Sequence, residues 1–184
     1  MAAATHAAHA THDSLRIKRA GLWLFFFSET ILFGLLMSAR FFLEGIEREH
    51  LDQALGVGIT SILVTSSVTA YMAETAIEHD RRSDAMWWLL GTIALGFIFA
   101  FGVGYEWATA EFTRHEAFGT VFFTMTGVHA AHVLSGVGLL ALVAIQLGRG
   151  RFSSKDHWPI SGTIMYWHFV DIVWIFFYPT LYLV

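Results

Sequence analysis

The sequence predicts an all-α membrane protein: a five-helix transmembrane bundle that runs up and down through the bilayer. Of the 184 residues, 55% are hydrophobic and only 14% are charged, which is typical of a membrane protein. Five apolar stretches are each long enough to cross the hydrocarbon layer as a helix. Because the connections between them are short, consecutive helices should be antiparallel. The expected spans are about 21–43, 54–73, 85–105, 117–147 and 160–184.

The segment before the first span is rich in alanine, histidine and threonine and lacks the pattern of a cleaved signal peptide. We expect residues 1–13 to form a disordered, retained tail in front of a single transmembrane domain at 14–184. His6, His9 and His12 recur at every third position and could gather a metal loosely if the tail became helical. No rigid scaffold follows to close such a site.

The first span carries an acid, and the second carries hydroxyl groups. Glu29 lies on the order of 13 Å past Ala20 along the first helix, among phenylalanines. Such an acid can relay protons, or it can simply close a hydrogen bond. In the second span, hydroxyls can bond to their own helix or to a neighbouring one. They are Thr60, Ser61, Thr65, Ser66, Ser67 and Thr69.

The third span, 85–105, is an apolar run, whereas the fourth places Met125, His129, His132 and Gly136 along one line. Small residues around this line permit close helix approach. Two histidines three residues apart on one helix cannot supply opposite axial ligands to one haem iron. Each would need a partner from another helix, and His168 is the only other histidine inside a span. We therefore expect no metal or haem in this chain.

The fifth span contains the run YWHFVD at 166–171. Counted from Ile160, Asp171 lies on the order of 16 Å deep, near the bilayer midplane. A polar and aromatic stripe surrounds it and predicts a hydrogen-bonded contact between helices, with a catalytic site as the alternative. His168 and Asp171 could pair directly or through another helix. The buried polar helix contacts that we expect are His129, His132, Trp167, His168, Asp171 and Trp174.

Charge and composition set the orientation and exclude several classes of protein. Eight lysines and arginines lie on one predicted side and three on the other, which places the amino terminus in the cytoplasm and the carboxyl terminus outside. The chain has no cysteine, which excludes disulfides, iron–sulfur clusters and cysteine nucleophiles. The net charge of -4 shows no basic surface, so no nucleic-acid partner is expected.

Four motifs occur in order along the spans: SETILF at 28–33, IEHDRR at 77–82, GVHAAHV at 127–133 and YWHFVDIVW at 166–174. In this arrangement the chain resembles subunit III of the haem-copper terminal oxidases, in its shorter five-helix bacterial form. The resemblance covers nearly all of the chain from Gly21 onward.

The resemblance implies an accessory subunit without catalytic residues or metal of its own, in a bacterial cytoplasmic membrane. Its partners would be subunit I, which carries haem and copper, and subunit II, in a complex that passes electrons from cytochrome c to oxygen and translocates protons. Implied roles are stabilising subunit I, holding phospholipids, supporting proton uptake and providing a path for oxygen. Glu29 matches the family's carbodiimide-reactive acid, and Arg149 and Arg151 are candidates for binding lipid headgroups.

Three alternatives remain open at this stage. The chain could be subunit III of a quinol oxidase, although such members tend to have aspartate in place of Glu29. It could also be an accessory protein of nitric oxide reductase. A stand-alone proton carrier built on Glu29 and Asp171 is a third alternative. Carriers usually show inverted repeats or broken helices, whereas the prolines here, Pro159 and Pro179, lie near the ends of the last span.

Overall fold

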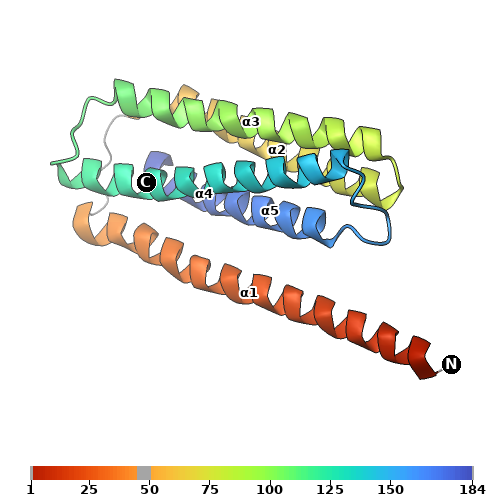
Figure 1. Ribbon diagram of the computed structural model, residues 1–184. Coiled ribbons are helices and arrows are strands. Elements are labelled where there is room, and N and C mark those ends of the chain that lie inside the picture. Colours follow the sequence, from red (N-terminus) through yellow and green to blue (C-terminus); the bar gives the residue numbers. More distant parts are fainter. Residues whose placement is uncertain (1, 45–50, 184) are drawn as a thin grey trace. The chain divides into compact units, whose positions relative to one another are not determined.

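A computed structural model of the chain describes residues 2–44 and 51–183, and it is built from helices (Figure 1). The helices are α1 (Ala2–Glu44), α2 (Gln53–Glu78), α3 (Arg82–Thr109), α4 (Ala117–Gly148) and α5 (Trp158–Tyr178), which continues as a short π-helix, Pro179–Leu183. Within the described residues, five helices are long and apolar enough to span a membrane. The predicted all-α, five-span fold is confirmed, with Val184 of the fifth expected span outside the described residues.

Two compact units make up the chain, Met1–Leu35 and Leu36–Val184, and their relative placement is not determined. The single transmembrane domain expected at 14–184 stays a prediction. Within the first unit, α1 begins at Ala2, whereas a disordered tail was expected over residues 1–13. The segment is rich in alanine, the residue with the highest helix propensity, and this favours continuing the helix of the first span toward the amino terminus.

The second unit contains a closed ring of four helices. Helix α2 packs against α3 and α5, and α4 packs against the same two helices from the other side (Figure 1). Neighbours in sequence are antiparallel, as the short connections predict. The last turns of α1 also belong to this unit, where the buried Arg40 guanidinium lies 5.3 Å from the ring centre of Phe118 on α4.

Glycines bring the helices close to one central indole. Trp167 of α5 is fully buried. A Cβ atom on Gly96 of α3 would lie 2.7 Å from the Trp167 ring, and one on Gly136 of α4 would lie 2.9 Å from it. Neither position can hold a larger side chain without movement, so the two glycines clamp the ring between α3 and α4.

The α2–α3 and α4–α5 loops are joined at one end of the ring. Asp80 has a left-handed backbone, with φ of 56°, and its carboxylate accepts hydrogen bonds from the backbone N–H of Ser154 at 2.9 Å and from its hydroxyl at 2.7 Å. These bonds from Ser154 hold the pKa of Asp80 below its usual value. The contact fixes two loops that lie 74 residues apart in sequence.

Candidate functional site

The central polar cluster joins α2 and α5 around Asp171, which is 3% exposed. The Ser67 hydroxyl donates a hydrogen bond to Asp171 Oδ2. The hydroxyl oxygen of Ser67 also lies 3.1 Å from His168 Nδ1. Ser67 therefore bridges His168 and Asp171, which makes their contact indirect, through a second helix. The other carboxyl oxygen, Oδ1 of Asp171, is buried and has no hydrogen-bond partner among the described residues.

Two tryptophans on either side of this cluster also bond to hydroxyls of α2. The indole N–H of Trp167 donates to Ser66 at 3.0 Å, and that of Trp174 donates to Thr60 at 3.0 Å. Both indoles are fully buried, where an unpaired N–H would be costly. Hydroxyl groups on one helix thus satisfy donors on the other and fix the rotation of α2 against α5.

The α4 histidines lie in two different environments. His129 is fully buried, with its ring centre 4.9 Å from that of Trp174 and 5.7 Å from that of Phe99. His132 Nδ1 instead lies 2.8 Å from the carbonyl oxygen of Val128 in its own helix. Across the described residues, no group of three His, Cys, Asp or Glu side chains is placed to hold a metal ion.

A second buried acid, which the sequence analysis missed, lies toward the other end of the ring. Glu106 of α3 is 4% exposed, and the hydroxyl of Tyr182 lies 2.7 and 2.6 Å from its two carboxylate oxygens. The Gln53 amide donates to the backbone carbonyl of Tyr182, which adds α2 to this contact. The predicted third span ended at Tyr105, so Glu106 fell just outside it. Its position directly after an unbroken apolar run was the available signal.

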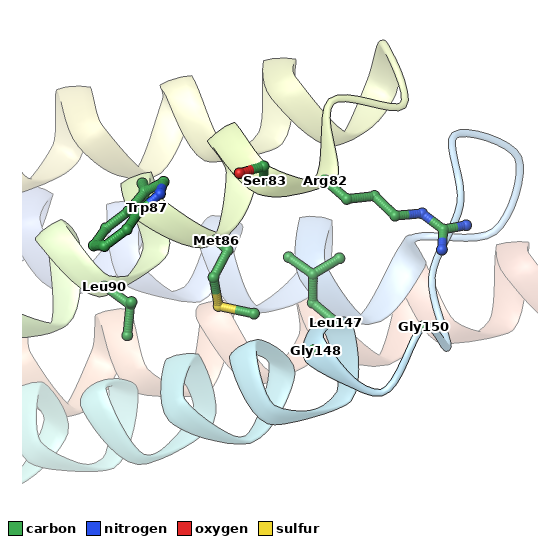
Figure 2. Close-up of a pocket in the computed structure, with 8 residues that line it drawn as sticks. All are labelled: Arg82, Ser83, Met86, Trp87, Leu90, Leu147, Gly148 and Gly150. Carbon is green, nitrogen blue, oxygen red and sulfur yellow. The ribbon is translucent and has the colours of Figure 1, made fainter.

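A pocket of about 440 Å³ lies between the start of α3 and the end of α4 (Figure 2). Its lining combines a cation with an apolar wall: Arg82, Ser83, Met86, Trp87, Leu90, Leu147, Gly148 and Gly150. In Figure 2, the Arg82 side chain extends toward the loop that holds Gly150, and Trp87 and Leu90 lie farther along α3. Arg149 and Arg151 are exposed on either side of Gly150. The pocket therefore offers a positive charge at one end and hydrocarbon along the rest.

The whole chain, residues 1–184, matches the family model described as cytochrome c oxidase subunit III. The chain belongs to the cytochrome c oxidase subunit III family. A relative named cytochrome c oxidase subunit 3, from Thermostichus vulcanus, is 32% identical over 181 residues, which cover 94% of this chain and 90% of that protein. A relative of the same name from Gadus morhua is 39% identical over 124 residues, 67% of this chain and 48% of that protein.

The chain thus spans about half the length of the Gadus morhua relative and nine-tenths of the Thermostichus vulcanus one. The cytochrome c oxidase subunit III family comprises accessory subunits of haem-copper oxidases. The family resemblance inferred from the four motifs is confirmed, and this chain is a multi-pass membrane protein of that family.

Glu29, the acid that the sequence singled out in the first span, lies on α1 in the first unit. The hydroxyls beside it bond within the same helix: Ser28 donates to the carbonyl of Phe25 at 2.8 Å, and Thr30 donates to that of Phe26 at 2.7 Å. The cluster at Asp171 belongs to the second unit.

Proposed function

We propose that this chain is the accessory, non-catalytic subunit III of a proton-translocating cytochrome c oxidase. The observation that supports this proposal is the match to the family over the full chain. The geometry agrees with a stabilising role, because the buried polar groups around Asp171 and Glu106 are used in contacts between helices. The four-helix ring of the second unit then offers a firm surface against which a larger subunit can pack.

Haem and copper would reside in subunit I and subunit II, the partners of this chain in a bacterial cytoplasmic membrane. We place the amino terminus on the cytoplasmic side. The Asp80–Ser154 contact supports this orientation, because it brings the two basic loops to the same end of the ring. All of the positive charge counted in these loops then lies at one membrane surface, as the positive-inside rule requires.

Purification of the complex through a tag on this chain tests the proposal. We expect two larger chains, haem absorbance and oxidation of cytochrome c in the same preparation. Oxidation of quinol but not of cytochrome c would assign the chain to a quinol oxidase. Reduction of nitric oxide would identify it as an accessory protein of nitric oxide reductase. Gradient-driven proton flux through the chain alone in vesicles would contradict the accessory role.

We further propose that the Arg82 pocket holds an anionic phospholipid. A phosphate fits beside the Arg82 guanidinium, with Arg149 and Arg151 adding charge at the membrane surface. The acyl chains would follow the apolar wall formed by Trp87 and Leu90. Native mass spectrometry should show loss of a bound lipid in Arg82→Ala. The neighbouring variant Arg81→Ala, which removes an exposed charge paired with Asp84 outside the pocket lining, should keep it.

Support of proton uptake and of oxygen access by this subunit completes the proposed role. Apolar surfaces and bound lipid hold oxygen better than water does, and basic loops at the cytoplasmic surface attract buffer anions that carry protons. The number of catalytic turnovers before the oxidase loses activity is the measurement. Removing this subunit from the purified complex should lower that number, and an unchanged number would contradict the role.

A further inference from the structure

One hydroxyl group, Ser67 Oγ, contacts both a carboxyl oxygen of Asp171 and an imidazole nitrogen of His168. A serine hydroxyl has a single proton to donate and can accept through its lone pairs. It therefore donates to one of the two neighbours and accepts from the other. The direction of the whole chain of hydrogen bonds is then set by which of the two end groups holds the extra proton.

Two arrangements satisfy these contacts with the same number of protons. In the first, protonated Asp171 donates from Oδ2 to Ser67, and Ser67 donates to Nδ1 of neutral His168. In the second, Nδ1–H of imidazolium His168 donates to Ser67, and Ser67 donates to ionised Asp171. Conversion from the second to the first breaks the Nδ1–H bond as a new bond to Ser67 Oγ forms. The old Ser67 O–H bond breaks as the Oδ2–H bond forms.

We propose that Ser67 relays protons between His168 and Asp171, so that this cluster takes up and holds one proton inside the bundle. Starting from ionised Asp171 and neutral His168 that carries its proton on Nδ1, a proton enters at His168 Nε2. The Nδ1 proton then moves through Ser67 to Oδ2, and His168 is left neutral with its proton on Nε2. Proton uptake removes the negative charge of the Asp171 carboxylate from the apolar interior. This favours the state in which Asp171 is protonated and His168 is neutral.

The entrance to the relay lies toward the loop end of α2. Glu74 follows Ser67 by two turns on the same helix, is half-buried, and interacts electrostatically with His168. Four residues farther on, α2 ends at Glu78. In the proposed relay, this carboxyl passes protons from the loop region to His168 Nε2.

Beyond Asp171 the relay stops. The next polar group on this face of α5 is Trp174, whose indole N–H already donates to Thr60 and cannot accept a proton. From α4, the His129 ring lies against Trp174 with its plane tilted by 33°, and His132 Nδ1 lies beside a carbonyl of its own helix. From α3, Glu106 pairs with Tyr182 at the far end. The cluster is therefore a closed proton store and not a path across the membrane.

Infrared spectroscopy of the purified complex tests the relay through the carbonyl stretch of the protonated carboxyl. Asp171→Asn should remove one such band and so assign it. In Ser67→Ala, this band should shift to higher frequency because the carboxyl loses its acceptor, and its exchange in D₂O should slow at least about tenfold. Ser67→Thr keeps a hydroxyl and should retain both properties. Ser61→Ala, whose hydroxyl bonds only to the Val57 carbonyl, is the matched control.

Glu74→Gln provides an independent variant that leaves the central contacts intact. It should slow deuterium exchange of the Asp171 band without moving its frequency. The relay is wrong if no carboxyl band disappears in Asp171→Asn, or if Ser67→Ala and Glu74→Gln both exchange at the wild-type rate. Neither result depends on which subunits or haems copurify, so failure of the relay can be told apart from failure of the accessory role.

Discussion

Gly96 and Gly136 pack so closely against the Trp167 ring that Gly136→Ala should destabilise the protein. A Cβ atom at this position would lie 2.9 and 3.1 Å from two carbons of the Trp167 ring, and 3.2 Å from a carbon of Tyr166. Ordinary carbon contacts are at about 3.5–4.0 Å. The indole cannot move aside freely, because it is fully buried and its N–H is bonded to Ser66.

The expected cost follows from overpacking a close-packed interior, typically about 1–3 kcal/mol. Gly96→Ala presses on the same indole from α3, with contacts of 2.7 Å to the ring and 2.8 Å to Val137. The two substitutions share one neighbour, so their costs should not add. If the first substitution already displaces the Trp167 ring, the double variant should lose less stability than the sum of the single variants.

The assay is the free energy of unfolding, measured by titrating the purified complex with a denaturing detergent. Gly138→Ala is the matched control, since it makes the same chemical change on α4 where nothing lies within 4 Å of the new Cβ atom. We expect Gly136→Ala to lose stability and Gly138→Ala to keep or slightly gain it. Equal stability of the two variants would refute the reasoning about the clamp.

Three further predictions concern polar contacts. Asp80→Ala should speed hydrogen exchange at the Ser154 amide, because the amide loses its acceptor. The fold lowers the pKa of the Asp80 carboxyl. In the wild type, the contact is therefore complete above the usual pKa of aspartate and is lost as the pH falls through the lowered pKa. Tyr182→Phe should destabilise the complex by about 1–3 kcal/mol, because buried Glu106 loses the donor to both of its oxygens. Glu29→Gln should abolish carbodiimide labelling and leave oxygen reduction intact.

Each of these predictions has a comparison variant and a contrary outcome. Asp84→Ala removes an exposed acid at the start of α3 and should not change exchange at Ser154. Tyr105→Phe removes a hydroxyl from a residue that is 55% exposed and should be neutral; equal effects of the two tyrosine variants would contradict the Glu106 contact. For Glu29, a collapse of oxygen reduction would show that this acid takes part in turnover.

Hydrophobic length was enough to predict the five spans, because a helix that crosses a bilayer needs about 20 apolar residues whatever it packs against. The polar stripe of α5 was also visible in sequence. The bridge from Ser67 to His168 and Asp171 was not, because it depends on the rotation of α2. Hydroxyls lie around much of that helix, and only packing selects which of them face α5.

Other differences between the predicted and the observed structure arise at the ends of helices and in the loops between them. Ending the third span at Tyr105 hid Glu106, since the boundary of a helix is set by packing as well as by composition. The Arg82 pocket depends on how a loop folds beside α3, and hydropathy carries no information on that. At the amino terminus, the low complexity of the segment favoured disorder, whereas its alanine content favours the helix that the structure shows.

Two hydrogen-bonded contacts hold the four-helix ring. Asp80 bonds to Ser154 at one rim, and Glu106 bonds to Tyr182 at the other. Each joins partners separated by more than 70 residues, 74 in one case and 76 in the other. During synthesis, the earlier partner must therefore enter the bilayer or its surface long before the later one emerges from the ribosome. Closure of the ring at either rim therefore waits until the later partner has reached the membrane.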